Sequence, residues 1–152
     1  DIGPYAIHTL RQCFKENPIR VKAIAKLNEH GADISTTGLI DFGNNKRATF
    51  DISFECTRRS EFEAFGALGR VKCPTVWQPD DKQAKIIINT ESSGLTEEVL
   101  PAANHFILEI NHFNKVISSD IVPKLSNEDA FWNAKTLESI EQSIKKDGWI
   151  HL

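Results

Sequence analysis

Residues 36–56 read TTGLIDFGNNKRATFDISFEC, and this stretch decides the fold. It begins with a strand-like run over 36–42 and ends with a second run over 48–56, in which apolar and polar residues alternate. Between the two, residues 43–46 are the small polar residues of a tight hairpin. Strands joined by so short a connection must be antiparallel, because a parallel crossover needs about a dozen residues or more.

Further runs of the strand type lie on both sides of this hairpin. They cover 21–27, 61–65, 70–73 and 84–89, and short connections join several of them. Together with the central pair they predict an open, predominantly antiparallel sheet of about six strands.

The two ends of the chain have the helical period instead. Apolar residues recur at spacings of three and four over 5–14 and over 106–117, and a third such stretch follows Ser126. The Ser126 hydroxyl is predicted to cap that last helix, with Asp129 three positions on, and residues 149–152 are predicted as a final edge segment. The order of one helix, a run of strands and then helices predicts an α+β fold with the helices packed on one face of the sheet.

Length and composition indicate one globular domain over residues 1–152. The chain is 40% hydrophobic and 26% charged, and its apolar runs fall far short of the roughly 20 residues of a membrane span. Its 18 basic and 21 acidic residues are interspersed, which leaves no broad basic face for nucleic-acid phosphates. Membrane and nucleic-acid partners are therefore not expected.

The sequence contains no methionine, although a chain of this length would have two or three at the usual frequency of about two per cent. We therefore expect a fragment of a longer protein. The three cysteines, Cys13, Cys56 and Cys73, are widely spaced and fit no metal pattern. They are expected to be small buried hydrophobes in a protein of a reducing, cytoplasmic compartment.

Local catalytic and metal-binding motifs are absent from the sequence. It has no glycine-rich phosphate loop of either common type, no HExxH and no GxSxG. His105, Glu109 and His112 fall on one helical face, but seven residues of helix span about 10.5 Å, which is too far for two ligands of one ion. No metal site is predicted.

The first helix carries the candidate catalytic residues. Asp1 and Tyr5 are four residues apart and His8 follows three further on, so all three side chains project from one face. A carboxylate, a phenol and an imidazole together can transfer protons, but a phenol with a pKa of about 10 needs a nearby cation, and no lysine of this helix lies on that face. The alternative is an ordinary helix start with Asp1 near its N-terminus and Tyr5 half buried.

Several segments taken in order resemble one protein family. Residues 1–8 (DIGPYAIH) look like the D-x-G-x-Y helix of the Gfo/Idh/MocA oxidoreductases, the group of glucose–fructose oxidoreductase and inositol dehydrogenase. The other matching segments are 38–43 (GLIDFG), 65–71 (FGALGRV) with Pro74 and Trp77, 109–113 (EINHF) and the end of the last helix at 143–148. The resemblance is to the carboxy-terminal domain of that family and covers essentially the whole chain.

The resemblance implies a place in a larger enzyme. In this family an amino-terminal Rossmann domain, absent from this chain, binds NAD or NADP and carries a Glu-Lys-Pro motif whose lysine would be the missing cation. The carboxy-terminal domain forms the substrate side, and its open sheet often forms the oligomer interface. The chain is thus expected to be the substrate-binding and oligomerisation domain of an NAD(P)-dependent oxidoreductase acting on a sugar or polyol, a homo-oligomer through its sheet face, and inactive in isolation.

The resemblance also implies residue roles. Tyr5 matches the proton donor and acceptor of the branch that includes dihydrodiol and xylose dehydrogenases, and Asp1 matches the catalytic acid of the motif. His8 takes a substrate-facing position that is more often Asp or Asn. No residue of this chain is expected to bind the cofactor itself. The competing hypothesis is a non-catalytic carbohydrate-binding or dimerisation module on the same scaffold.

Overall fold

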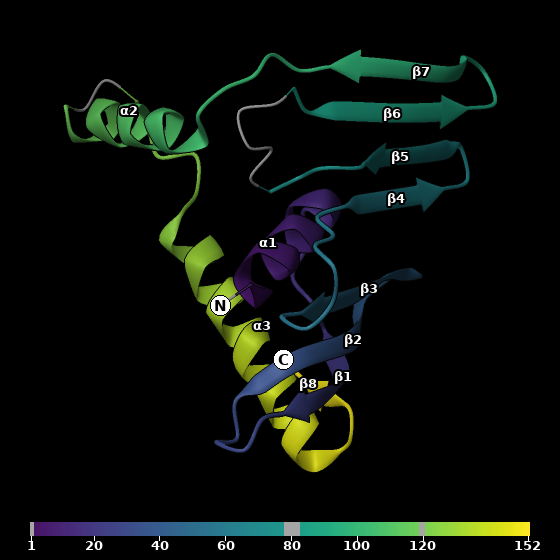
Figure 1. Ribbon diagram of the computed structural model, residues 1–152, viewed down its shortest axis with the longest axis vertical. Helices are drawn as coiled ribbons and strands as arrows, with labels where there is room; N and C mark the ends of the chain where they lie inside the picture. The colour runs from purple at the N-terminus through teal and green to yellow at the C-terminus, as the bar shows by residue number, and fades with distance from the viewer. Residues whose placement is uncertain (1, 78–82, 119–120) are drawn as a thin grey trace. The chain divides into compact units, whose positions relative to one another are not determined.

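The computed structural model of the chain describes residues 2–77, 83–118 and 121–152. The chain divides into two compact units, which Figure 1 shows as ribbons. Unit 1 combines residues 1–56 with residues 125–152, and unit 2 comprises the intervening residues 57–124. Each unit is described by itself.

Unit 1 contains a four-stranded antiparallel sheet. Its strands are β1 (Arg20–Leu27), β2 (Asp33–Gly43), β3 (Lys46–Ser53) and β8 (Ile150–His151), in the order β3-β2-β1-β8. The predicted hairpin is confirmed, because Gly43 pairs with Lys46 and the two asparagines between them have positive φ, as a tight turn requires. The predicted edge segment at the carboxy terminus is confirmed as β8.

Two helices cover one face of this sheet. Helix α1 (Gly3–Phe14) contacts β3, and α3 (Asn127–Lys146) contacts β1, β8 and α1 (Figure 1). The buried core that they close is made of Ile7, Val21, Ala23, Ile40, Phe42, Phe50 and Ile140. The alternation of β1 and β2 points every second side chain into this core, and the helical stripes point Ile7 and Ile140 at it. The predicted packing of helices on one sheet face is therefore confirmed for unit 1.

One buried hydroxyl joins the end of α3 to the sheet. Ser143 is fully buried, and its Oγ accepts a hydrogen bond from the Ala23 amide of β1 at 3.0 Å. The same hydroxyl donates to the Gly148 carbonyl at 2.5 Å, just after the left-handed residue Asp147 that ends the helix. A backbone amide of β1 that faces α3 instead of a strand is thus satisfied inside the core.

Unit 2 has a four-stranded sheet of its own. Strands β4 (Phe62–Gly66), β5 (Gly69–Cys73), β6 (Lys85–Thr90) and β7 (Gly94–Val99) are antiparallel and follow one another in sequence order. Strand β7 was not predicted, because the alternation of its apolar and polar residues is weak and every one of its residues is exposed. The α+β class is confirmed, but the single sheet of about six strands is corrected to two sheets of four strands each.

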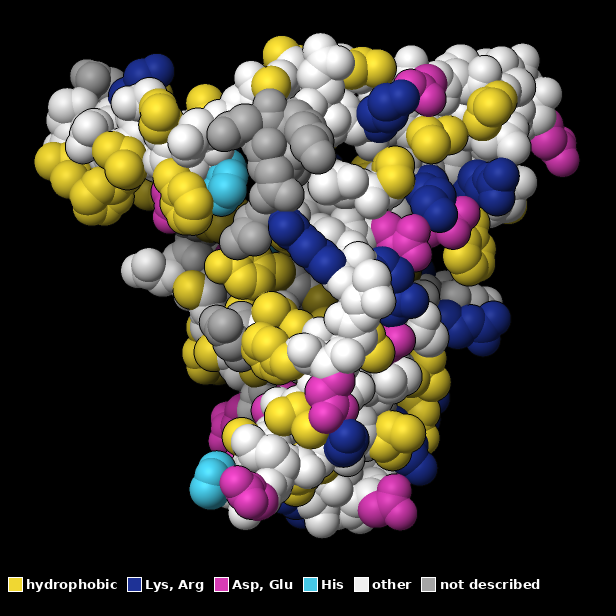
Figure 2. Space-filling view, in the orientation of Figure 1, with side chains coloured by type: hydrophobic (Ala, Val, Ile, Leu, Met, Phe, Trp, Pro, Cys, Tyr) yellow, Lys and Arg dark blue, Asp and Glu magenta, His cyan; other side chains and the backbone are white. Residues whose placement is uncertain are grey.

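Helix α2 (His105–Ile117) belongs to unit 2 and has no buried residue. Asn104 caps it, since its side-chain oxygen accepts from the Ile107 amide at 3.2 Å. The large exposed apolar side chains of the helix are Phe106, Ile107, Leu108, Ile110, Phe113 and Ile117. Figure 2 shows hydrophobic side chains gathered on this part of the surface. Across the described ranges, no helix combines the length and the apolar character needed to cross a membrane.

The expected burial of the cysteines is wrong for two of the three. Cys13 and Cys56 are exposed, and Cys73 is half-buried. Cys56 lies beyond the end of β3 at Ser53, so the alternation that predicted an inward side chain no longer applies there. Loss of hydration raises the pKa of the Cys73 thiol.

An ion pair ties the strands of unit 1 together at one end of the sheet. Asp41 Oδ1 accepts from the Gly43 amide at 2.9 Å, and Asp41 Oδ2 accepts from Arg20 Nε at 2.8 Å. The Arg20 guanidinium lies 4.7 Å from the ring centre of Trp149, next to β8. The Gly43 amide and then the Arg20 guanidinium hold the pKa of the Asp41 carboxyl below its ordinary value.

This pair predicts a pH-dependent loss of stability in Asp41→Asn. A carboxylate whose pKa falls on folding stabilises the protein above its unfolded-state pKa, and this stabilisation is lost as the pH falls through the folded-state pKa. Urea midpoints should therefore be lower in the variant near neutral pH. They should converge with those of the wild type at pH values well below 3.8, the ordinary pKa of an aspartate carboxyl. Glu29→Gln, which removes an exposed carboxyl in the turn between β1 and β2, is the control. A difference that persists unchanged in acid would contradict this account.

Candidate functional site

The first turn of α1 is held tightly against the rest of unit 1. A Cβ placed on Gly3 would lie 3.3 Å from a methyl carbon of Leu137, a tight contact, and 3.6 Å from one of Ile52. The Asn133 side chain of α3 donates to the Pro4 carbonyl at 3.3 Å. Packing against β3 and α3 thus fixes where the helix that carries Tyr5 and His8 begins.

Tyr5 presents its phenol on the surface of α1. The residue is 56% exposed, and its hydroxyl has no hydrogen-bond partner in the described part of the chain. Its backbone carbonyl accepts from the Thr9 hydroxyl at 2.8 Å, as in an ordinary helix. The phenol is therefore available to a ligand. Asp1 lies outside the described residues, so its predicted place beside Tyr5 stays a prediction.

His8 lies one turn further along α1 and faces a carboxylate of α3. Its Nδ1 is 3.3 Å from Asp129 Oδ2, and the two side chains are 32% and 15% exposed. The imidazole is thus half open to solvent and has a charged partner on its inner side. A histidine backed by a carboxylate in this way can accept, donate or hold a proton.

The partner of His8 is a residue that the sequence analysis marked only for its place in a helix cap. Asp129 Oδ1 lies 3.1 Å from Arg11 Nη1 and accepts from Gln12 Nε2 at 2.9 Å. The Asp129 backbone carbonyl accepts from Arg11 Nη1 at 2.9 Å. We call His8, Arg11, Gln12 and Asp129 the Asp129 cluster.

Arg11 forms the buried centre of this cluster. The residue is only 5% exposed, and its second terminal nitrogen donates to Asn17 Oδ1 at 3.0 Å. A guanidinium taken out of water needs such charged and polar acceptors, because an unpaired buried charge is very costly. The helical spacing of His8, Arg11 and Gln12 puts the three on one face of α1, a signal that the sequence analysis did not use.

The first turn of α3 places the Asp129 carboxylate. The predicted cap is confirmed, since Ser126 Oγ accepts from the Asp129 amide at 3.1 Å. An acidic side chain in the first turn is also stabilised by the helix dipole. The carboxylate is therefore held by its own helix as well as by α1.

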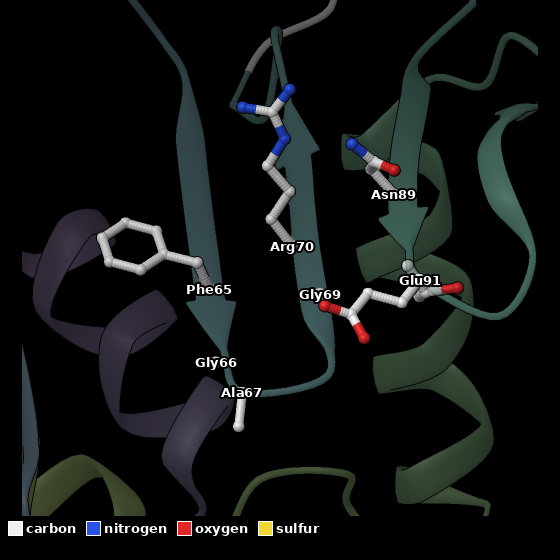
Figure 3. Close-up of a pocket in the computed structure, with 8 residues that line it drawn as sticks. Phe65, Gly66, Ala67, Gly69, Arg70, Asn89 and Glu91 are labelled. Atoms are coloured by element: carbon white, nitrogen blue, oxygen red, sulfur yellow. The ribbon is translucent and has the colours of Figure 1, made fainter.

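A second and more open feature lies on unit 2. A shallow groove of about 370 Å³ runs across the β4–β5 hairpin and the end of β6; it is lined by Phe65, Gly66, Ala67, Gly69, Arg70, Asn89, Thr90 and Glu91. Figure 3 shows the side chains of Arg70 and Asn89 extending from neighbouring strands. The groove contains none of the predicted site residues, and its Arg70 already faces Glu63 at 3.7 Å. The surface of α1 is the stronger candidate.

Metal ligands do not gather in the part of the chain that the structure describes, which contains no group of three or more His, Cys, Asp and Glu side chains suited to an ion. The two histidines weighed as metal ligands have other neighbours. His105 lies against the Phe106 ring, and His112 Nε2 accepts from the Lys124 amide at 3.3 Å. The groups described at α1 are a phenol, an imidazole and their hydrogen-bonding neighbours.

A known protein family matches the segment that contains α1. The model of the GFO/IDH/MocA C-terminal domain matches residues 1–72. The resemblance to the Gfo/Idh/MocA family is thereby confirmed. The matched residues run from α1, with Tyr5 and His8, through β1, β2 and β3 of unit 1 to β5. A comparison with curated proteins finds no match.

Solved structures share the fold over nearly the whole chain. The aldose–aldose oxidoreductase of Caulobacter crescentus, complexed with glycerol, matches with a TM-score of 0.82 and 15% identity over 99% of this chain and 46% of that one. KijD10, a 3-ketoreductase of Actinomadura kijaniata complexed with TDP-benzene and NADP, matches with a TM-score of 0.83 and 21% identity over 94% and 46%. The chain thus spans less than half the length of these structures. At such identities the likeness establishes the fold alone.

The pair of Arg11 and Asp129 predicts that Arg11→Met strongly lowers the stability of the protein. This substitution removes the guanidinium and leaves the Asp129 carboxylate poorly paired, so we expect the free energy of unfolding to fall by about 3 kcal/mol in urea titrations. Lys145→Met is the matched control, because Lys145 pairs with Glu141 on an exposed part of α3 and should contribute less than about 1 kcal/mol. Equal midpoints for the two variants would show that the Arg11 pair does not hold α1 on α3.

Proposed function

We propose that this chain is the carboxy-terminal, substrate-side part of an NAD(P)-dependent oxidoreductase that acts on a sugar or a polyol-like substrate. The observation that carries the proposal is the phenol of Tyr5, which is exposed and has no hydrogen-bond partner among the described residues, on a helix that the family model includes. The shared fold with oxidoreductases whose complexes contain NADP, TDP-benzene or glycerol supports it. The Tyr-type branch of the family is part of the proposal.

The residues of this chain fit one side of a nicotinamide site. The sequence has no glycine-rich phosphate loop. In this proposal the amino-terminal part of the full-length protein would bind the dinucleotide phosphates. The exposed Tyr5 phenol and the half-exposed His8 imidazole fit the substrate oxygens instead. When bound, the nicotinamide supplies or accepts the hydride.

Tyr5 moves the proton at the substrate oxygen in this proposal. Its phenol donates to the oxygen when a carbonyl is reduced and accepts from the hydroxyl when an alcohol is oxidised. A phenol does this near neutral pH only beside a cation, and in the described ranges no lysine or arginine side chain forms a hydrogen bond or a cation–π contact with Tyr5. The amino-terminal part would supply that cation, Asp1 would orient the group, and His8 would bind a substrate hydroxyl.

Tyr5→Phe tests this role in the full-length protein. Loss of the phenol oxygen should reduce turnover by about 10²–10⁴-fold, because proton transfer to the substrate oxygen is lost. Cofactor affinity, measured by fluorescence titration, should not change, since the phenol does not hold the dinucleotide. Thr9→Val removes another hydroxyl of α1 and should leave turnover unchanged. Wild-type turnover in Tyr5→Phe would remove Tyr5 from the mechanism.

A second candidate function is a non-catalytic carbohydrate-binding or dimerisation module. The outer face of the unit 1 sheet favours the dimer part, because Ile24 is 64% exposed on it, between Lys22 and Lys26 of β1. Polar residues around an apolar centre are typical of a modest interface between subunits. We propose a homo-oligomer through this face in either case. Three free cysteines agree with a reducing, cytoplasmic compartment.

Sedimentation of the chain tests the interface. The wild type should sediment as a dimer at tens of micromolar, and Ile24→Lys should shift it toward the monomer, because a lysine would have to be desolvated at the centre of the interface. Val122→Lys, which also replaces an exposed apolar side chain but lies outside every strand, should remain a dimer. A wild-type monomer at these concentrations would argue against a sheet-mediated pair.

A further inference from the structure

We propose that Asp129 is a positioning residue for His8. Its carboxylate holds the imidazole with the proton on Nδ1, which leaves Nε2 as the nitrogen that meets a substrate hydroxyl. The inference rests on the proposed function, in which His8 faces the substrate. It adds a residue of α3, far from the family motif in sequence, to the substrate side of the enzyme.

The two oxygens of Asp129 are divided between different partners. Oδ1 is taken by Arg11 Nη1 at 3.1 Å and by Gln12 Nε2 at 2.9 Å. Oδ2 is the oxygen that lies 3.3 Å from His8 Nδ1. The division leaves one carboxylate oxygen directed at the imidazole, and the buried guanidinium prevents the carboxylate from turning away.

Asp129 is in place before any substrate arrives. The Ser126 cap fixes the first turn of α3, and Arg11 bonds to the backbone carbonyl of Asp129 as well as to its side chain. Arg11 is itself 5% exposed and fixed by Asn17. A ligand-contacting group that is held by a rigid supporting layer loses little freedom on binding.

The carboxylate selects one tautomer of His8. A neutral imidazole has one N–H and one acceptor nitrogen, and a carboxylate can only accept. The proton therefore belongs on Nδ1, facing Asp129, and Nε2 keeps its lone pair. Nε2 then accepts a hydrogen bond from a hydroxyl, which a methyl or an ether oxygen of a ligand cannot donate.

The arrangement suggests which substrates fit. Tyr5 and His8 are three residues apart on α1, so the phenol and Nε2 lie on successive turns of one helix face. A polyol or sugar with two neighbouring oxygens could place the reacting oxygen at Tyr5 and a hydroxyl at His8. Compounds that lack the second hydroxyl would leave Nε2 unpaired and should bind more weakly.

The tautomer of His8 can be measured without any enzymatic assay. Long-range proton–nitrogen NMR correlations of the ¹⁵N-labelled 152-residue chain, recorded where the ring is neutral, should show Nδ1–H for His8, with His8→Gln identifying its signals. Asp129→Asn should weaken this preference in favour of Nε2–H. Glu128→Gln, which removes a charge from the same helical turn at an exposed position, should leave it unchanged.

Kinetics of the full-length protein test whether Asp129 acts through His8. We expect His8→Ala and Asp129→Asn each to raise KM for the sugar or polyol about 10-fold, with a smaller effect on kcat. The double variant should be no worse than His8→Ala alone, because the carboxylate then has nothing left to position. Glu128→Gln should have wild-type constants.

Two results would overturn the inference. One is a wild-type His8 in the Nε2–H form, which decides the matter even if Asp129→Asn fails to fold. The other is an additive loss in the double variant, which would make Asp129 a purely structural residue. Failure of the proposed function is a separate outcome: turnover that survives Tyr5→Phe would disprove that proposal, while the NMR result would still decide the arrangement of Asp129 and His8.

Discussion

The buried guanidinium of Arg11 is the constraint on which the candidate site depends. A charge that is 95% removed from solvent must be paired, and here its acceptors are Asn17, in the segment between α1 and β1, and Asp129, in the first turn of α3. The apolar contacts of Ile7 and Ile140 bring the two helices onto the same sheet face, but such contacts are not directional. The hydrogen bonds of Arg11 are directional, and they join α1, which carries Tyr5 and His8, to the first turn of α3.

Local pattern in the sequence was sufficient for most elements. The alternation over 48–56 and the helical spacing over 5–14 predicted β3 and α1 because each has one face in a core. The same reasoning failed for β7, which is exposed along its whole length and therefore has little alternation to detect. It also overestimated the length of β3, because the alternating pattern continues to Cys56 although the strand ends at Ser53. Which strands share a sheet depends on pairing between distant segments, so two four-stranded sheets could not be distinguished from one larger sheet.

The sequence predicted residues of the candidate site only where they lie close together along the chain. Tyr5 and His8 were found by helical spacing and by the family motif, and both lie on α1 as expected. Asp129 was noted as the third residue after a capping serine, but its contacts with His8 and Arg11 span more than a hundred residues. Nothing in single-sequence periodicity reports such a contact. The helical spacing of His8, Arg11 and Gln12 is also that of an ordinary solvent-exposed helix face, so it could not by itself indicate Asp129.

The division of the chain has a consequence for the order of folding. Unit 1 is made from both ends of the chain, and Ser143 bonds β1 to a helix that is synthesised only after all of unit 2. The strands of unit 2 pair with their sequence neighbours, so their contacts are local and can form early. During synthesis the β1–β2–β3 sheet must therefore wait with α3 missing from its apolar face, which α1 covers only in part, while unit 2 completes its hairpins. That interval, rather than the finished structure, is when this protein is most exposed to aggregation.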